Sequence, residues 1–566
     1  MLAAATATTP VSSASTRVRL PLLQKYLAEQ QELSAVERFA QQHDDASLSD
    51  QARHYEHLLP ATAPGPGQQY SFSVDLDRCS GCKACVTGCH SLNGLDESET
   101  WRSVGLLQGG KLENPLQQTV TTACHHCVEP GCLKGCPVNA YEKDEQTGIV
   151  RHLDDQCIGC QYCTMTCPYD VPQYNPRLGI VRKCDMCSSR LKAGEAPACV
   201  QACPTEAIAI RLVDVKEVIE KAAAERFLPD SPSPRSTLPT TSYRTERELP
   251  ENTTAADAHN LKPAHNHVPL VVMLVLTQLS VGAFALDYLA ALHGLPQGAH
   301  RLIALIALGL GLLGLGASVF HLGRPLYAFR ALVGLLHSWM SREVLFFGLF
   351  GAFAPLYVAS LWLTPLAELV HLPAFSEELL AQLESLLGAA TLVNGLLGVA
   401  CSVLLYAVTG RRWWRLSATG AKFFGTALGS GTLLVAQVLL AHDVSEAHSA
   451  STSSWALLVF GSLLASAKLF GELSVVSHRD ANTWTDFKRT ALLLTIHLRP
   501  LLELRIALAV LGVAAPWVVL MAAPNRAIAL AALACAGLAL VMGEFLERSL
   551  FFMAVAPARM PGAVGQ

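Results

Sequence analysis

The stretch CSGCKACVTGCH, from Cys79 to His90, decides how the first half of the chain folds. It places four cysteines within eleven residues at the spacing C-x2-C-x2-C-x3-C. Three evenly spaced thiols suit three corners of a compact metal cluster, while the fourth thiol stands one residue further out and can point away. The run therefore holds either one metal centre or parts of two, and the other cysteines decide between these alternatives.

Most of the remaining cysteines also fall into groups of four, and the group from Cys157 to Cys167 repeats this spacing. Sixteen of the eighteen cysteines fall into four groups of four. The groups are Cys79, Cys82, Cys85 and Cys89; Cys124, Cys127, Cys132 and Cys136; Cys157, Cys160, Cys163 and Cys167; and Cys184, Cys187, Cys199 and Cys203. In bacterial ferredoxins a C-x2-C-x2-C-x3-C-P run gives three ligands to one 4Fe-4S cluster and its last cysteine to another. The opening run is therefore predicted to serve two clusters.

Zinc sites and disulfides are the alternatives for so many thiols. Zinc prefers separated C-x2-C pairs in four-coordinate sites, and a disulfide scaffold needs an oxidising compartment. Proline follows Cys136, Cys167 and Cys203 and turns the backbone away after the outlying thiol, whereas His90 follows Cys89. The pattern favours iron-sulfur clusters, and the first group departs from it because no proline follows its last cysteine.

The second half of the chain is built of long apolar runs. From Val268 to about Leu546, eight segments of roughly twenty mostly apolar residues have the length that crosses a bilayer. The predicted spans are 268–292, 302–320, 344–363, 386–409, 423–440, 455–476, 504–523 and 527–546. The predicted fold class is a duplicated α+β bacterial-ferredoxin-like domain followed by an all-α polytopic membrane domain of eight transmembrane helices.

Composition divides the chain into four parts. They are an N-terminal helical extension (1–68), a four-cluster electron-transfer domain (69–228), a flexible linker (229–267) and a membrane anchor (268–566). Within the extension, Leu20–Gln42 repeats apolar residues near helical spacing, and Ser34 with Glu37 matches a capping box, so a helix pair is predicted. The linker is rich in Pro, Ser, Thr and charge, which predicts a tether without a fold of its own.

Charge and the first residues of the chain predict its surroundings. With 42 basic and 46 acidic residues, nothing indicates a nucleic-acid partner. The N-terminal residues show no Sec or twin-arginine signal. Basic residues gather in the connections on the side of both termini, and the other side carries only Arg301 and Arg526. The positive-inside rule thus predicts a multi-pass protein of the inner (cytoplasmic) membrane, with the cluster domain and both termini in the cytoplasm.

The cysteine block from Tyr70 to Asp214 resembles the four-cluster electron-transfer subunit of the dimethyl sulfoxide reductase family of molybdenum enzymes. The resemblance implies that the first group pairs with the fourth and the second with the third. The implied ligand sets are set 1, Cys79, Cys82, Cys85 and Cys203; set 2, Cys184, Cys187, Cys199 and Cys89; set 3, Cys124, Cys127, Cys132 and Cys167; and set 4, Cys157, Cys160, Cys163 and Cys136. Because Cys132 is present, all four clusters are expected to be 4Fe-4S rather than 3Fe-4S.

The segment FHLGRPLYAFRALVGLLHSWMSREVLFF (Phe320–Phe347), with YAVTGRRWW and GEFLERSLFF further on, resembles the membrane-anchor subunit of the same reductases. By this resemblance His321 and Glu343 match residues linked to quinol binding, where they would exchange protons with a quinone. Arg324 and Arg342 are candidates to orient the quinone headgroup. The residues alone also allow His321 to reach lipid headgroups, Glu343 to pair with an arginine, and the arginines to face solvent or lipid.

Three further charged residues lie within the predicted spans. Lys468 and Glu472, four residues apart, are either a proton relay or an intrahelical ion pair. Asp287 in the first span is similarly ambiguous. An ion-pumping module would place these three residues at its centre.

The sequence shows no nucleotide-binding glycine loop, molybdopterin domain or haem-attachment CxxCH, so a molybdopterin-containing catalytic partner is expected to carry the substrate chemistry. The resemblance implies a fused electron-transfer and anchor subunit that links this partner to membrane quinone. Membrane lipid is the other expected partner. Its topology favours cytoplasmic sulfite oxidation of the sulfite dehydrogenase type. The alternatives are a quinol-dependent nitrate or S-/N-oxide reductase, and a membrane-anchored redox sensor or scaffold without quinone chemistry.

Overall fold

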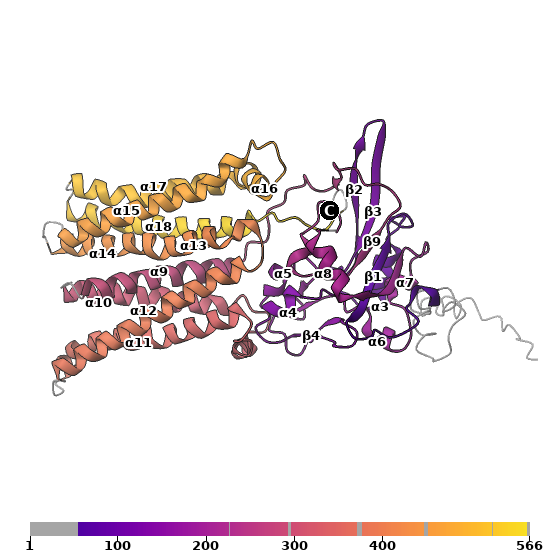
Figure 1. Cartoon of the computed structure of the whole chain (residues 1–566). Helices are drawn as coiled ribbons and strands as arrows, with labels where there is room; N and C mark the ends of the chain where they lie inside the picture. Colours follow the sequence, from indigo (N-terminus) through magenta and orange to yellow (C-terminus); the bar gives the residue numbers. More distant parts are fainter. Residues whose placement is uncertain are drawn as a thin grey trace, which may run out of the picture.

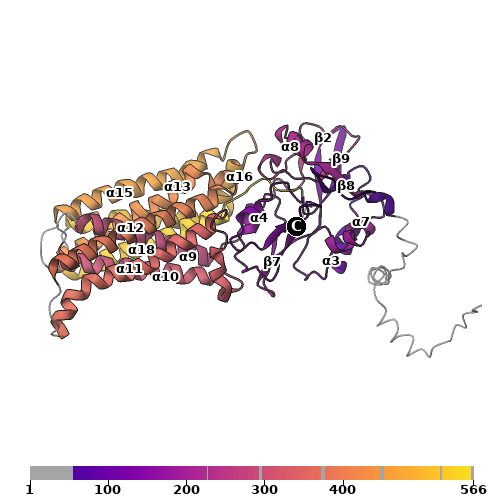
Figure 2. The ribbon, with the colours of Figure 1, turned by 60° about the horizontal axis from the view of Figure 1, so that its bottom comes forward.

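The computed structural model describes residues 55–225, 227–291, 296–370, 376–446, 451–522 and 525–562. Two bodies lie side by side in both views, a mixed α+β domain and a bundle of long helices (Figures 1 and 2). This arrangement confirms the predicted fold class. The helix pair predicted within Leu20–Gln42 lies outside the described residues.

The α+β domain is built from short elements between the cysteine groups. Its strands are β1 (Gln68–Asp75), β2 (Ser103–Lys111), β3 (Asn114–Thr122), β4 (Tyr141–Lys143), β5 (Val150–His152), β6 (Gln173–Asn175), β7 (Ile180–Arg182), β8 (Ile208–Asp214), β9 (Ser242–Arg244) and β10 (Thr254–Ala255). Its α-helices are α3 (Ala84–Leu92), α4 (Gly131–Gly135), α5 (Tyr162–Thr166), α6 (Ser188–Lys192), α7 (Ala198–Gln201) and α8 (Val215–Ala223).

Strand pairing closes the cysteine block on itself. β1 pairs antiparallel with β8, with Gln68 opposite Asp214, so the first and fourth cysteine groups are brought together. The second and third groups are each followed by a two-stranded antiparallel hairpin, β4–β5 and β6–β7 respectively. β1 precedes the first cysteine group, β5 precedes the third, and β7 and β8 flank the fourth.

The segment 229–267 differs from the flexible linker that its composition predicts. β9 pairs in parallel with β1, and β10 pairs antiparallel with β2, so residues from this segment complete two three-stranded sheets. Thr240 donates a hydrogen bond to the carbonyl of His125 at 2.7 Å and accepts one from Ser71 at 2.6 Å through its own carbonyl. A polar segment can be ordered by pairing its backbone with open sheet edges, which a compositional criterion does not detect.

The bundle contains the eight predicted membrane-crossing segments, each long and apolar enough to span a bilayer. Its α-helices are α9 (Val268–Ala291), α10 (Gln297–Val319), α11 (Trp339–Val370), α12 (Glu377–Ala407), α13 (Leu416–Phe424), α14 (Gly431–Ser445), α15 (Thr452–Leu473), α16 (Asp486–Leu492), α17 (Arg499–Ala522) and α18 (Arg526–Met553). A π-helical turn, Gly425–Ser430, joins α13 and α14 into one span. Most helices are longer than predicted because they continue through the polar residues that end an apolar run.

The connection between α10 and α11 holds the two bodies together. The amides of Gly323 and Arg324 donate hydrogen bonds to the carbonyls of Gly159 and Ile158, at 3.3 and 3.0 Å. A Cβ on Gly323 would lie 2.2 Å from the carbonyl oxygen of Gly179, so only glycine permits this approach. The third cysteine group is therefore fixed against the end of the membrane helices.

Candidate functional site

The four cysteine groups share one backbone geometry. In each group the residue immediately before the second cysteine has a left-handed conformation. These residues are Gly81 (φ 73°), His126 (φ 40°), Gly159 (φ 69°) and Met186 (φ 60°). Asn139, Asp170 and Glu206, each three residues after an outlying cysteine, are also left-handed. The repeated conformation agrees with the internal duplication that the sequence predicts.

The outlying cysteine of each run lies beside the group that the resemblance pairs with it. The thiol of Cys136 lies close enough to Cys157 for their charges to interact, and Cys167 stands in the same relation to Cys132. Cys89 is likewise near Cys199, and Cys85 is near Cys203.

Neighbouring thiol sets also lie close enough for their charges to interact, in a fixed order. Cys85 of set 1 interacts with Cys89 of set 2, and Cys184 of set 2 interacts with Cys124 of set 3. Tyr141 lies near both Cys132 of set 3 and Cys163 of set 4. The sets therefore follow one another from set 1, where Cys82 is exposed, to set 4, which adjoins the helix bundle.

The surroundings of the thiols fit iron-sulfur clusters. Among the described residues, no group of three or more His, Cys, Asp and Glu side chains is arranged to hold a single metal ion, whereas a 4Fe-4S cluster spreads its four thiolates over four irons. Backbone amides donate to cysteine sulfurs, from Ala140 to Cys136 at 3.3 Å and from Ala207 to Cys203 at 3.2 Å. Such hydrogen bonds tune cluster potentials.

Burial makes a free thiolate unfavourable in these groups. It raises the pKa of the Cys132 and Cys187 thiols to about 12. A thiolate in such a place needs positive charge beside it, and cluster iron supplies that charge when it is bound. Burial acts the same way on Cys157, but the hydrogen bond and charge of His152 outweigh it, so the pKa of Cys157 is lowered.

Two buried cations near the thiols were not among the residues predicted from the sequence. Lys183 donates to the Cys124 sulfur at 3.6 Å and to the carbonyl of Cys184 at 2.8 Å, so it lies between sets 2 and 3. Arg102 is buried near Cys85 and Cys199, and these thiols raise its pKa against the opposing effect of burial. The position of Lys183 beside Cys184 in the sequence is the signal that could have identified it.

An apolar pocket lies between set 4 and the helix bundle. Its volume is about 380 Å³, and its walls include Cys160, His321 and Glu343, together with Tyr162 and Phe347. The structure thus brings both predicted proton-exchanging residues to one cavity, beside a predicted cluster ligand. The remaining lining is mostly Leu, Met, Val and Ala side chains, which suits an apolar ligand.

The two proton-exchange candidates in this pocket, His321 and Glu343, have different partners. Glu343, 8 % exposed, accepts a hydrogen bond from Ser402 of α12. The Nε2 atom of His321 is buried, and no hydrogen-bond partner for it is present in the described part of the chain. Burial lowers the pKa of His321 to about 4 against the opposing effect of a hydrogen bond to the backbone of Cys160, so its ring is neutral at pH 7.

The predicted headgroup role of Arg324 and Arg342 does not agree with their positions. Arg324 donates to the carbonyl of Asp154 at 2.8 Å, and Arg342 donates to the carbonyls of Leu335 and Leu336 at 3.0 and 2.8 Å. Neither residue lines the pocket. Both side chains instead hold connecting loops, because a guanidinium satisfies several carbonyl oxygens at once.

Comparisons with known proteins give the family of both halves. Residues 262–553, just over half of the chain, match the family model of the DMSO reductase anchor subunit (DmsC). The chain belongs to this family of membrane anchors. Residues 117–212 match a 4Fe-4S dicluster domain. One polypeptide therefore carries an iron-sulfur region and a DmsC anchor.

Relatives of the iron-sulfur region are separate subunits of oxidoreductase complexes. The B subunit of the anaerobic dimethyl sulfoxide reductase of Haemophilus influenzae is 38% identical over 156 residues, which are 26% of this chain and 76% of that protein. Thiosulfate reductase electron transfer subunit PhsB of Salmonella typhi is 39% identical over 153 residues, 26% of this chain and 79% of that protein. The formate dehydrogenase-O iron-sulfur subunit of Escherichia coli is 36% identical over 172 residues, which are 27% of this chain and 55% of that protein. The iron-sulfur region is an electron-transfer subunit of the DMSO reductase family, fused to the DmsC anchor.

The structure also gives the partners of the three ambiguous charged residues in the anchor domain. Lys468 and Glu472 form the intrahelical ion pair, at 3.3 Å. Asp287, near the C-terminal end of α9, accepts a hydrogen bond from His300 at 2.7 Å.

Proposed function

We propose that this chain passes electrons through four 4Fe-4S clusters between a molybdopterin-containing catalytic subunit and a quinone bound in the apolar pocket. The observation that carries the proposal is the pocket itself, because Cys160 of set 4 and the side chains of His321 and Glu343 line one cavity. A quinone that receives electrons from set 4 would lie between Cys160 and the side chains of His321 and Glu343.

The ordered thiol sets support the electron path. Clusters bound in sets 1 to 4 would transfer single electrons between a partner that exchanges electron pairs and the membrane. Set 1 includes the exposed Cys82, so we place the docking surface of the catalytic subunit at this end. Set 4 lies at the other end, where Ser338 donates to the carbonyl of Gly135 at 2.8 Å.

The pocket chemistry supports the quinone. Reduction of a quinone consumes two electrons and two protons, so a proton-exchanging group is needed beside each oxygen. Glu343, oriented by Ser402, is placed to exchange a proton, and His321 has a buried nitrogen that lacks a partner among the described residues. We assign Glu343 to proton exchange and His321 to the second oxygen of the quinone.

We further propose that the catalytic partner oxidises sulfite in the cytoplasm. The proposal rests on the charge asymmetry of the connections, which favours a cytoplasmic cluster domain, and on the fusion of the two subunits. The relatives favour a second candidate, because the dimethyl sulfoxide reductase and thiosulfate reductase subunits carry the names of reductases. In that case the protein would draw electrons from quinol and deliver them to an S- or N-oxide.

Sulfite is expected to reduce the clusters in the intact complex. The complex is purified anaerobically with its catalytic subunit, and visible absorbance is followed after sulfite is added. Bleaching supports a dehydrogenase that feeds quinone. If sulfite leaves the absorbance unchanged while nitrate or an S-oxide reoxidises chemically reduced clusters, electrons flow from quinol to the catalytic subunit, as in a terminal reductase.

The chain is expected to contain about sixteen iron atoms and about sixteen acid-labile sulfides, the content of four 4Fe-4S clusters. Substituting either Cys132 or Cys167 with alanine should alter the same electron paramagnetic resonance signal, because both belong to set 3. Cys136→Ala should alter a different signal, although Cys136 and Cys132 lie in one run. Stoichiometric zinc, or one signal shared by Cys132→Ala and Cys136→Ala, would contradict the assignment.

A further inference from the structure

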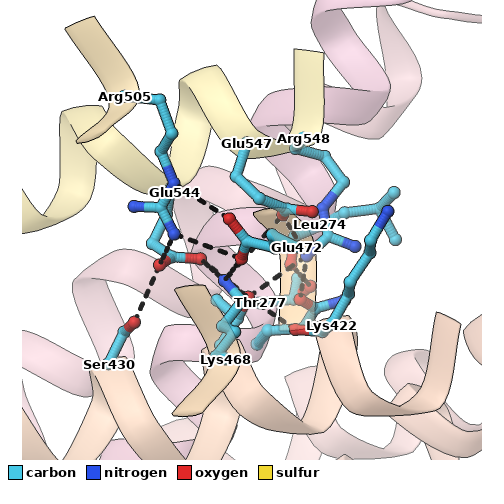
Figure 3. Close-up of polar contacts among 12 residues, drawn as sticks. Leu274, Thr277, Lys422, Ser430, Lys468, Glu472, Arg505, Glu544, Glu547 and Arg548 are labelled. Carbon is cyan, nitrogen blue, oxygen red and sulfur yellow. Dashed lines mark hydrogen bonds and ion pairs between the residues drawn. The ribbon is translucent and has the colours of Figure 1, made fainter. Parts of the chain in front are cut away.

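A cluster of seven charged residues, of which six are buried and Glu472 is partly exposed, lies in the membrane domain, apart from the apolar pocket (Figure 3). Its members are Lys422, Lys468, Glu472, Arg505, Glu544, Glu547 and Arg548, and we name it the buried charge cluster. Arg505 pairs with Glu472 at 3.3 Å and with Glu544 at 3.1 Å. Lys468 pairs with Glu472, and Arg548 pairs with Glu547 at 3.2 Å. Six of the seven residues are therefore joined by ion pairs.

Lys422 is the member without an ionic partner. Among the described residues, no hydrogen bond or ion pair engages its ammonium, which lies over the rings of Trp413 and Phe551 at 3.3 and 5.3 Å from their centroids. The charge of Glu547 reaches Lys422, but this carboxylate forms its ion pair with Arg548. Four cations face three carboxylates in the cluster, which leaves one positive charge in excess. Since an ammonium in a largely buried side chain is costly without a close counter-ion, and Lys422 is only 6 % exposed, this position favours an anion beyond those that the described residues supply.

A cavity of about 330 Å³ adjoins Lys422. Its lining includes Arg415 and His478 as well as Lys468 and Glu472. Glu472 is a carboxylate, but its charge is already paired with Lys468 and Arg505. The cavity lies where α13 begins and α15 ends, which is the end of the bundle that faces the iron-sulfur domain (Figures 1 and 2). The unpaired charges that face this space are therefore positive.

The neighbourhood of the cavity connects it to the bilayer. Leu416, next to Arg415, is 56 % exposed, and Phe470, on the same turn of α15 as the lining residue Gly471, is 79 % exposed. Apolar side chains exposed on a membrane-crossing helix face acyl chains. Basic pockets between membrane helices near the bilayer surface bind phospholipid headgroups. A phosphate in the cavity would thus have basic partners, and its acyl chains would have an apolar surface.

We propose that this cavity binds the phosphate of an anionic phospholipid headgroup, with Lys422 and Arg415 as its cationic partners. The ligand supplies the charge that balances the buried charge cluster. The site is separate from the quinone pocket, and it does not depend on the quinone assignment.

The test measures lipid binding to the intact complex in a non-ionic detergent. Phosphatidylglycerol is titrated in, bound lipid is counted by native mass spectrometry, and the midpoint of thermal unfolding is followed. We expect one saturable phosphatidylglycerol that raises the midpoint, with phosphatidylcholine binding at least tenfold more weakly. Arg415→Gln should weaken phosphatidylglycerol binding by about fivefold, the effect of one basic residue at a membrane surface. Lys422→Met should abolish the site.

Arg479→Gln is the matched control. Arg479 is exposed, follows His478 directly and does not line the cavity, so its loss removes the same charge from the same face. The Arg479→Gln variant should bind phosphatidylglycerol as tightly as the wild type does. Equal weakening by Arg415→Gln and Arg479→Gln would overturn the site, as would equal binding of the two lipids. Displacement of the lipid by inorganic phosphate at millimolar concentration would overturn the lipid assignment in favour of a free anion. Should Lys422→Met not fold, Arg415→Gln decides the question alone.

Discussion

Glu343→Gln is expected to lower quinone turnover by roughly 10²- to 10⁴-fold, the range that a general acid or base contributes. The amide keeps the size of the side chain and can still hydrogen-bond to Ser402, but it cannot exchange a proton. The loss should appear in kcat with quinone analogues, measured on the complex in membranes. His321→Ala should lower kcat and also raise KM for the quinone. The Nε2 atom of His321 has no hydrogen-bond partner among the described residues and is predicted to bind a quinone oxygen.

Cluster spectra and transfer to an artificial acceptor distinguish a loss of proton exchange from damage to the clusters. In both variants all four clusters should keep their spectra, and transfer to a soluble artificial acceptor should remain at the wild-type rate. Glu384→Gln is the matched control, since Glu384 lies on α12 eighteen residues before Ser402, about 27 Å along the helix. Wild-type quinone turnover in Glu343→Gln would refute the assignment.

The sequence predicts the cluster domain well because its chemistry is local. Three cysteines at C-x2-C-x2-C spacing and a turning residue such as Gly81 are contiguous, so the loop geometry follows from the run itself. The partnership between groups is not local. The proximity of Cys85 and Cys203 depends on the pairing of β1 with β8, and it was reached only through the family resemblance.

The membrane site shows the same division. His321 and Glu343 belong to one recognisable segment. Ser402 of α12 donates a hydrogen bond to Glu343, and Tyr162 of the iron-sulfur domain lines the pocket, but no common spacing in the sequence marks these two residues. Lys468 and Glu472 were visible as a pair because they are four residues apart on one helix. Glu544, 76 residues from Lys468, completes their network and carries no local signal. Contacts between distant helices are therefore what the sequence alone could not supply.

Glu544 is expected to be the most sensitive position in the buried charge cluster. Its carboxylate accepts hydrogen bonds from Lys468 and from Arg505 at 3.1 Å, as well as from Thr426 and Ser430 at 2.8 and 2.9 Å. Glu544→Gln leaves Arg505 paired with Glu472, and Lys468 paired with Glu472 and, at 3.9 Å, with Glu547. Removing one partner of a buried ionic network costs about 3–5 kcal/mol of unfolding free energy, because it leaves uncompensated buried charge.

The matched control for this variant is Glu503→Gln. Glu503 pairs with Arg499 at 2.7 Å, but both side chains are more than half exposed, so the loss should be no more than about 1 kcal/mol. Unfolding is followed in mixed detergent micelles by the loss of helical circular dichroism. The double variant Glu544→Gln with Lys468→Met restores the wild-type net charge of the cluster and should recover part of the lost stability, which a double-mutant cycle measures. If Glu544→Gln and Glu503→Gln cost the same, the buried charge cluster does not depend on Glu544, because its loss would then leave no buried charge uncompensated.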